Sequence, residues 1–235
     1  MVQIFVGTSG WLYSWNLGDS LDWYVRNSGL NAVELNASFY RYPFKNQVFS
    51  WARKGSSLRW SIKIHRSISH LYKLSDRSYE NWRRFRELFE PMNNLIDFFL
   101  LQLPPNYRFS NNNLEKVKRF IKESGEENRL AIEFREASWF SRKEEELCSE
   151  LEGAYIVSVD SPDTTWMISC RETVYLRLHG RSSWYLHNYS DEELNEIIDK
   201  IINLYPKRIY VFFNNNHWML ENARKLLTQL NNRLS

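Results

Sequence analysis

Short apolar segments recur along this chain at nearly regular spacing, and each carries polar residues near its C-terminal end. Eight such segments span residues 4–8, 32–36, 60–65, 98–102, 130–135, 155–160, 174–179 and 209–214. Because side chains alternate between the two faces of a strand, Glu34 and Asn36 share a face, as do Glu133 and Arg135. Eight strands with mostly helical spacers are typical of a closed parallel barrel, whose active site lies at the C-terminal ends of its strands. The pattern therefore predicts an α/β fold, a TIM-like (β/α)8 barrel with its site at that rim.

One spacer breaks the helical pattern. Residues 161–173, between the sixth and seventh predicted strands, contain Pro162, Asp163 and paired threonines, and they show no helical period. We expect an irregular connection without a regular helix there, so the barrel would be incomplete or distorted. A doubly wound open sheet gives a similar alternation, but it rarely carries polar residues on all its strands, and we therefore favour the barrel.

Length and composition limit the class of protein. The chain has 235 residues and no Gly/Ser-rich or Pro-rich linker, and one such barrel needs about 250 residues, so we expect a single domain over residues 1–235. The sequence shows neither a signal-peptide pattern nor an apolar run near the roughly 20 residues of a membrane span. We expect a cytoplasmic protein with no membrane partner. Cys148 and Cys170 form no metal or redox motif, and we expect free thiols.

Charged side chains gather at the predicted rim, where an unpaired buried charge would be costly. The strand ends carry three carboxylates and three cations: Glu34, Glu133, Asp160, Lys63, Arg135 and Arg177. We take Glu34 or Glu133 as a general base and His179 or Lys63 as a general acid. Two alternatives stay open: either glutamate could be the structural partner of an arginine, and the whole set could be a network that only satisfies itself.

The other candidates are polar or aromatic residues at the strand ends and on the loops that follow. We expect ligand binding from Thr8, Trp11, Asn36, Tyr40, His70, Gln102, Arg135, Trp139, Asp160, Arg177, Arg181, Asn214 and Asn215. Guanidinium groups hold phosphate or carboxylate in bidentate fashion, and aromatic rings stack on a sugar or base, although a single ring is more often packing. The set predicts a phosphate-bearing ligand.

The composition of the rim argues against a large metal centre. The sequence has no His-x-x-x-His, no Asp-x-His and no Cys cluster, and three cations would lie among the ligands. No metal ligands are assigned and no cofactor is firmly implied. A single Mg²⁺ or Mn²⁺ on one of the three carboxylates stays an alternative.

Basic residues are concentrated in residues 51–86. This stretch holds ten basic and two acidic residues, interleaved with aromatic rings. Cations hold phosphates and rings stack on bases, so DNA or RNA is a candidate partner, with Arg83, Arg84 and Arg86 as surface contacts. The alternative is a solvated helix face whose rings pack inward.

Taken in order, the loop motifs resemble those of the YecE-like family, the domain of unknown function 72. They are Gly7-Thr8-Ser9-Gly10-Trp11, Val33-Glu34-Leu35-Asn36, Gln102-Leu103-Pro104, Glu133-Phe134-Arg135, Arg177-Leu178-His179-Gly180-Arg181 and Phe213-Asn214-Asn215. The resemblance spans essentially the whole chain. It implies a TIM-barrel-like fold related to xylose isomerases and apurinic endonucleases, and it implies no settled activity. Ala37-Ser38 departs from the Ser-Thr that is usual in the family.

Three functions follow from these patterns. The first, favoured by a small margin, is a phosphodiester hydrolase or nuclease-like protein. The second is an isomerase or hydrolase of a small sugar or sugar phosphate, and the third is a non-catalytic barrel that binds an anionic metabolite. The fold alone does not choose among them, because barrels carry many chemistries.

Overall fold

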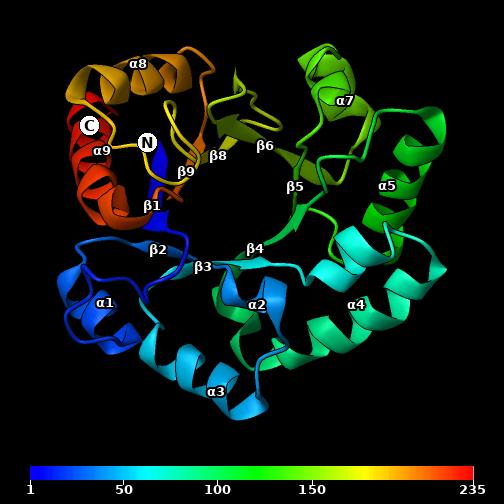
Figure 1. The fold of residues 1–235 in the computed structure, drawn as a ribbon, viewed down its shortest axis with the longest axis horizontal. Coiled ribbons are helices and arrows are strands. Elements are labelled where there is room, and N and C mark those ends of the chain that lie inside the picture. The colour runs from blue at the N-terminus through cyan, green and yellow to red at the C-terminus, as the bar shows by residue number, and fades with distance from the viewer. Residues whose placement is uncertain (235) are drawn as a thin grey trace. The chain divides into compact units, whose positions relative to one another are not determined.

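The computed structural model describes residues 1–234, in which strands and helices alternate (Figure 1). The strands are β1 (Gln3–Thr8), β2 (Ala32–Leu35), β3 (Arg59–Lys63), β4 (Ile96–Gln102), β5 (Leu130–Glu133), β6 (Ala154–Asp160), β7 (Thr165–Trp166), β8 (Thr173–Leu178) and β9 (Arg208–Phe213). The helices are α1 (Leu21–Asn27), α2 (Ala37–Tyr40), α3 (Lys45–Lys54), α4 (Asp76–Leu88), α5 (Asn111–Glu123), α6 (Ala137–Phe140), α7 (Glu144–Glu150), α8 (Asp191–Ile202) and α9 (Met219–Leu234). Short helical turns are η1 (Ser67–Leu71), η2 (Glu90–Leu95) and η3 (Asn216–Trp218).

The order of the strands defines the fold class. It runs β5-β4-β3-β2-β1-β9-β8-β6, and an additional β5–β6 pairing makes this order cyclic. The pairs β1–β2, β1–β9, β4–β5, β5–β6, β6–β8 and β8–β9 are parallel. This is the closed parallel barrel with surrounding helices that the eight apolar segments predicted, and the predicted fold class is confirmed.

The irregular connection is confirmed as well. No helix lies between Asp160 and Thr173, all within the described chain. Instead β7 turns back and pairs antiparallel with the end of β6, with Thr165 opposite Asp160 and Trp166 opposite Val159. This small hairpin was not predicted, since two residues are too short to show a strand period.

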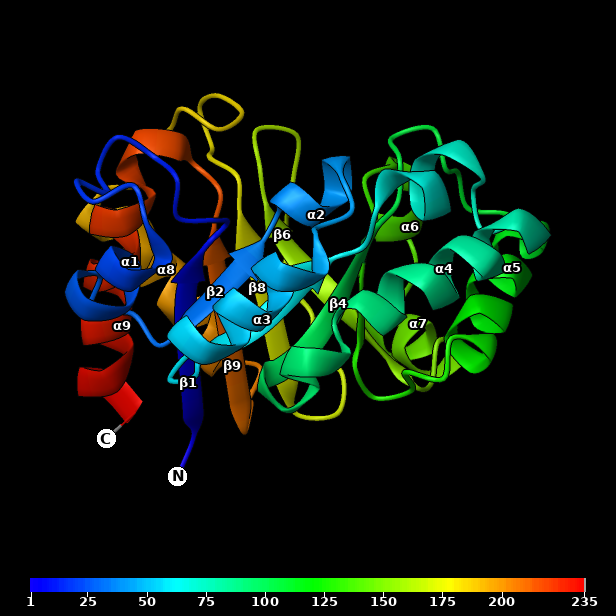
Figure 2. The same cartoon turned by 90° about the horizontal axis from the view of Figure 1, so that it is seen from below.

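The chain divides into two compact units, and unit 1 comprises residues Met1–Glu34, Lys54–Trp60 and the part from Val157 onward. In unit 1, β9 pairs over six residues with β1 and over six with β8. Helix α9 packs on β1 and β9 through apolar residues at helical spacing, among them Ala223, Leu226 and Leu230 (Figure 1). Figure 2 shows the loops that follow β1, β8 and β9 at one end of these strands.

Unit 2 comprises residues Leu35–Arg53 and Ser61–Ile156, and its core is rich in aromatic rings. Helix α4 turns Trp82 and Phe85 inward, and both are almost fully buried. The Trp82 ring lies edge-on to Phe99 at 5.3 Å, and its Nε1 donates to the Ser124 carbonyl oxygen at 2.8 Å. The ring nitrogen is therefore satisfied inside an apolar core, as a buried tryptophan requires.

Three further expectations concern the whole chain. The prediction of free thiols is wrong, because Cys148 and Cys170 are both disulfide-bonded; sequence spacing does not show which side chains the fold brings within bonding distance. No helix within residues 1–234 is long and apolar enough to cross a membrane. A single domain stays a prediction.

Gly7 provides a test of the strand packing in unit 1. A Cβ atom at Gly7 would lie 2.3 Å from the carbonyl oxygen of Ala32, the residue it pairs with on β2. We expect Gly7→Ala to lower the free energy of unfolding by about 3 kcal/mol, the upper end of overpacking costs, as measured by urea denaturation.

The matched control is Gly29→Ala. Gly29 has a φ of +72°, and no described atom lies within 4 Å of the added Cβ, so only backbone strain of about 1 kcal/mol is expected. If Gly7→Ala and Gly29→Ala lose the same free energy of unfolding, the steric account is contradicted.

Candidate functional site

In unit 1 the alternation of side chains along β8 turns Tyr175 and Arg177 to one face, and both contact the carboxylate of Glu34 at the end of β2. Glu34 Oε1 accepts from Ser9 Oγ at 2.8 Å and from Arg177 Nη2 at 2.6 Å. Oε2 accepts from Arg177 Nε at 3.0 Å and from the Tyr175 hydroxyl at 2.9 Å. Glu34 and Arg177 have side chains that are 0% exposed.

Ser9, Glu34, Tyr175 and Arg177 form what we call the glutamate cluster. The bidentate ion pair and the two hydroxyl donors occupy both oxygens of Glu34, so the cluster favours the structural alternative over a general base at this position. Sequence reasoning missed Ser9 and Tyr175. Tyr175 could have been found, because it lies two residues before Arg177 and so shares its strand face.

A second carboxylate of unit 1, Asp160 at the end of β6, is held in the same way. Its Oδ1 accepts from Thr165 Oγ1 at 2.6 Å and its Oδ2 from the Tyr189 hydroxyl at 2.7 Å. Arg181 Nε lies 3.1 and 3.2 Å from the two oxygens. Burial, followed by the charge of Asp160, raises the pKa of Tyr189, which keeps the hydroxyl protonated as a donor. In the sequence, Tyr189 is one of the aromatic residues after the His179-Gly180-Arg181 motif that suit stacking on a ligand, but in the structure it is a hydrogen-bond donor to Asp160.

Arg181 is also held from its other side. Its Nη1 lies 2.6 Å from Glu196 Oε2. Burial alone would lower the pKa of Arg181, but Glu196 and Asp160 raise it overall. Asp160 and Arg181, each a candidate for ligand binding, are instead partners of each other and of Thr165, Tyr189 and Glu196.

His179 and Asn214 also meet in unit 1. The Asn214 Nδ2 lies 3.3 Å from His179 Nδ1, and His179 is fully buried. The rings of Trp184 and Tyr185 lie 5.5 and 5.9 Å from the imidazole. Asn215 instead joins the end of β9 to the β8–α8 loop and to α9, because its Nδ2 donates to the His187 carbonyl and to the Asn222 side chain.

Thr8 and Trp11 lie on the loop after β1 and have packing roles. The Thr8 hydroxyl donates to the Gly10 carbonyl at 2.6 Å, and the side chain is fully buried. Trp11 is 7% exposed and lies edge-on to Trp60 at 5.8 Å. These contacts favour packing over ligand binding for both residues.

In unit 2, positive charge is concentrated around His70. Lys63 Nζ lies 4.5 Å from the centroid of the Phe39 ring, and the His70 ring lies edge-on to the same ring at 4.9 Å. Burial first, and then the charges of Lys63, Arg135 and two further cations, lower the pKa of His70 to about 4. The imidazole is therefore neutral at physiological pH.

Arg135, at the end of β5, contacts two other candidates of unit 2. Its Nε forms an ion pair with Glu133 Oε1, and its Nη2 lies 3.5 Å from Gln102 Oε1 at the end of β4. The parallel pairing places Gln102 opposite Glu133, which explains why the two strand ends meet. We call Lys63, His70, Gln102 and Arg135 the basic cluster.

The remaining candidates of unit 2 differ in exposure. Trp139 is fully buried, stacks on Phe134 at 3.9 Å and donates from Nε1 to the Tyr107 carbonyl at 2.7 Å, which favours packing. Tyr40 is 66% exposed. Asn36 is half-buried, and its side-chain oxygen has no hydrogen-bond partner within residues 1–234. Tyr40 thus presents a ring that a ligand could contact, whereas the Asn36 oxygen is itself buried.

In the basic stretch 51–86, the aromatic rings of α4 pack inward, as in the alternative of a solvated helix face. The rings of Tyr79, Trp82 and Phe85 are buried. Arg86 forms ion pairs with Glu90 and Glu126, whereas Arg83 and Arg84 are exposed on α4. Arg86 therefore has a structural role in place of the expected surface contact.

No group of three or more His, Cys, Asp or Glu side chains in the described chain is placed to hold a metal ion. Each of the three carboxylates proposed for a single Mg²⁺ or Mn²⁺ has an arginine partner instead. The three carboxylates therefore give no support to a bound Mg²⁺ or Mn²⁺.

The glutamate cluster yields a stability prediction. Arg177→Met leaves the Glu34 charge buried without its bidentate partner, and we expect the free energy of unfolding to fall by about 4 kcal/mol in urea denaturation. Tyr175→Phe, which removes one hydroxyl donor, should cost about 2 kcal/mol. Adding Glu34→Gln to Arg177→Met should recover part of the loss. If Arg177→Met loses no more free energy of unfolding than Tyr175→Phe does, the account is contradicted.

Comparison with known proteins agrees with the geometry. The sequence matches the family model of DUF72, described as a protein of unknown function, over residues 5–235. A solved DUF72 family protein from Thermotoga maritima is 28% identical with a TM-score of 0.79, over 99% of both chains. No match is found among curated proteins.

Two more distant structures share the fold. D-Psicose 3-epimerase from Clostridium cellulolyticum, solved with D-tagatose, is 8% identical with a TM-score of 0.62 over 100% of both chains. A xylose isomerase domain containing protein from Salmonella typhimurium is 14% identical with a TM-score of 0.57 over 92% of both chains. The family match covers nearly the whole sequence, and this chain belongs to the DUF72 family.

Proposed function

We propose that the basic cluster of unit 2 binds a small phosphate-bearing ligand. The observation that carries the proposal is the environment of His70, whose neighbours include Lys63 and Arg135 and whose pKa is lowered to about 4, first by burial and then by these charges. Like charges placed close together repel one another, and an anion bound among them relieves that repulsion. Arg135 and Lys63 supply the donors that phosphate prefers.

The ligand class that we infer is a sugar phosphate. Two solved proteins with this fold are named as a D-psicose 3-epimerase, solved with D-tagatose, and as a xylose isomerase domain containing protein. The exposed Tyr40 ring lies edge-on to Phe39, the ring that Lys63 contacts, and adds a surface for a sugar. The reaction class is then an isomerisation by proton transfer, with Glu133 as base and Lys63 as acid.

Thermal unfolding with three probes tests ligand binding. We expect ribose 5-phosphate to raise Tm by about 5–10 °C at a hundred-fold excess over its Kd, which corresponds to about 2.7 kcal/mol. Inorganic phosphate should give a smaller rise, and ribose none. Lys63→Met keeps an apolar side chain against Phe39 but removes the charge, so the rise should be lost.

The matched control is Lys122→Gln, which removes an exposed cation on α5 of the same unit. It should respond like the wild type. A rise with ribose 5-phosphate that survives in Lys63→Met, or no rise at any concentration, would refute binding at the basic cluster.

Glu133→Gln tests the proposed reaction separately from binding. The amide keeps the size of the side chain but cannot accept a proton as a base. We expect deuterium incorporation from D₂O into a panel of aldose and ketose phosphates, followed by mass spectrometry, to fall by about 10²–10⁴-fold, with the Tm rise retained. If Glu133→Gln unfolds the protein and leaves residual exchange normal, Glu133 is a structural partner of Arg135.

A nucleic-acid ligand is the second candidate, and one observation favours it. Lys45, Phe49 and Arg53 lie exposed at four-residue spacing on α3, and Arg83 and Arg84 are exposed on α4. Fluorescence anisotropy of single-stranded, duplex and abasic-site DNA at low and near-physiological salt tests this candidate. Salt-sensitive binding that is lost when Arg83 and Arg84 are neutralised would support it. No binding at low salt would leave only the small ligand.

A further inference from the structure

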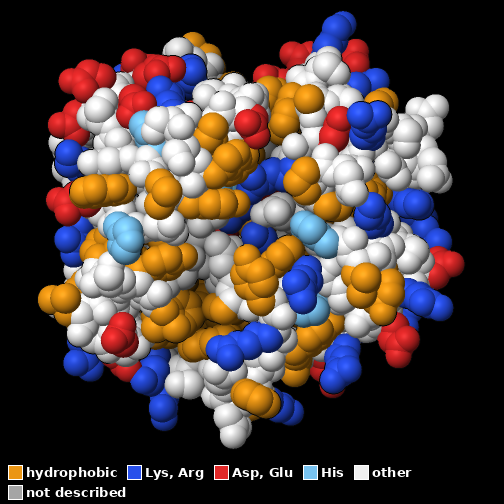
Figure 3. Space-filling model, in the orientation of Figure 1, with side chains coloured by type: hydrophobic (Ala, Val, Ile, Leu, Met, Phe, Trp, Pro, Cys, Tyr) orange, Lys and Arg blue, Asp and Glu red, His pale blue; other side chains and the backbone are white. Residues whose placement is uncertain are grey.

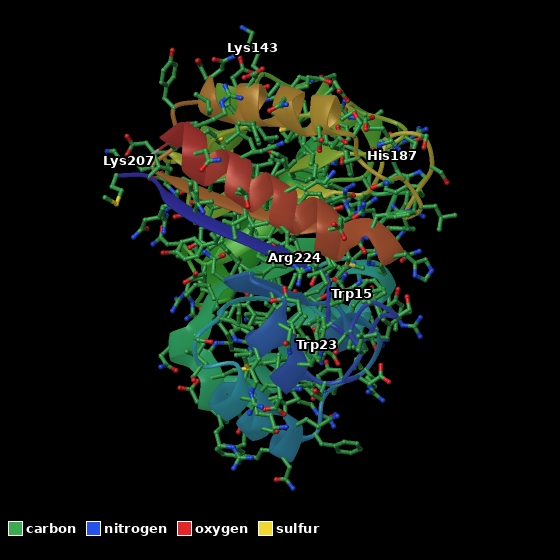
Figure 4. The ribbon with its side chains drawn as sticks, turned by 90° about the vertical axis from the view of Figure 1, so that its left-hand side faces the viewer. Trp15, Trp23, Lys143, His187, Lys207 and Arg224 are labelled. Carbon is green, nitrogen blue, oxygen red and sulfur yellow. The ribbon has the colours of Figure 1, made fainter. Side chains whose placement is uncertain are left out.

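Three polar side chains of unit 1 form a hydrogen-bonded series that belongs to neither cluster. Ser182 Oγ lies 2.8 Å from His187 Nδ1, and His187 Nε2 lies 2.9 Å from Glu193 Oε2. Ser182 and His187 lie in the loop between β8 and α8, where Figure 4 labels His187, and Glu193 lies in the first turn of α8. A hydroxyl, an imidazole and a carboxylate in this order are the parts of a serine hydrolase triad.

The neighbouring hydrogen bonds define the state of the imidazole. The backbone N–H of Ser182 also points to His187 Nδ1, at 3.4 Å, so this nitrogen acts as an acceptor. Nε2 then carries the proton and donates it to the Glu193 carboxylate. An unprotonated nitrogen facing a serine hydroxyl is the arrangement of a general base and its nucleophile.

Packing holds the imidazole in place. The His187 ring lies edge-on to Tyr189 at 4.6 Å, and the Tyr189 hydroxyl donates to Asp160. Gly180 has a φ of +103°, and a Cβ atom there would lie 2.7 Å from His187 Cβ, so only glycine allows this approach. The His187 side chain is 12% exposed, whereas Ser182 is open to solvent. The base is fixed and the nucleophile is accessible.

The surroundings indicate the kind of substrate. The N–H of Ser183 follows the nucleophile and donates no hydrogen bond in the described chain, so it is available to a developing oxyanion. Tyr185 and Leu186 are 39% and 62% exposed beside it. Acidic side chains gather over α8 (Figure 3), and Asp191 and Glu192 lie in its first turn. An uncharged substrate with an apolar group fits this surface better than an anion does.

We propose that Ser182, His187 and Glu193 form an esterase site for small uncharged carboxylic esters. Ser182 Oγ bonds to the acyl carbon and its proton passes to His187 Nδ1, and the departing alcohol oxygen then takes that proton as its bond to carbon breaks. Water attacks the acyl group, gives its proton to Nδ1, and Ser182 leaves with that proton and releases the acid. The site shares no residue with the basic cluster and does not rest on the phosphate ligand.

Labelling with a fluorophosphonate probe and hydrolysis of p-nitrophenyl acetate test the proposal on the full chain. We expect peptide mass spectrometry to find the probe attached to Ser182 in the wild type, and to find no label at this position in Ser182→Ala. His187→Gln should slow acylation by about 10²–10⁴-fold and remove its dependence on imidazole ionisation. Glu193→Gln, which preserves the helix cap, should slow it less.

Ser183→Ala is the matched control, because it alters the adjacent exposed serine but keeps the backbone N–H. Ser183→Ala should react with the fluorophosphonate probe and hydrolyse p-nitrophenyl acetate at the wild-type rate. Hydrolysis that is unchanged in Ser182→Ala, or folded wild-type protein that takes no probe on Ser182, would overturn the proposal. A pH profile that is the same in His187→Gln and wild type would also overturn it.

Discussion

A buried carboxylate is stable in a protein only when donors surround it, and this requirement organises the strand ends of unit 1. Glu34 accepts four hydrogen bonds, two of them from Arg177. Asp160 is met by Thr165, Arg181 and Tyr189. Two of the three carboxylates that the sequence places at the rim thus hold loops and strands together.

The basic cluster of unit 2 has the opposite balance. Its imidazole is neutral because burial and neighbouring cations disfavour a further positive charge. Lys63 lies over the face of Phe39, where the ring attracts a cation but does not neutralise it. Glu133 is the carboxylate that pairs with Arg135. Such a surplus of positive charge near one imidazole is the reason to place an anion here.

Much of the fold followed from local patterns, since period-two segments and helical spacers depend on residues close in sequence. The partners of the charged residues did not follow from local patterns. Glu34 and Arg177 lie 143 positions apart, and their pairing was one alternative that the sequence left open, without a choice between Arg135 and Arg177 as the partner. Trp139 and Trp82 are buried, although the sequence left open whether such rings stack on a ligand. The hairpin at β7 is local, but its two-residue strand is too short to show a period. The disulfide-bonded state of the cysteines depends on tertiary proximity, which spacing alone does not encode.

The central claim, an anion among Lys63, His70 and Arg135, is tested most directly by the His70 imidazole itself. Its Cε1–H resonance, followed by NMR against pH, should titrate with a pKa of about 4 in the free protein. Saturating ribose 5-phosphate should raise that pKa toward the ordinary value of about 6.5, because a nearby negative charge favours the protonated ring. An unchanged midpoint with ligand bound would contradict the account.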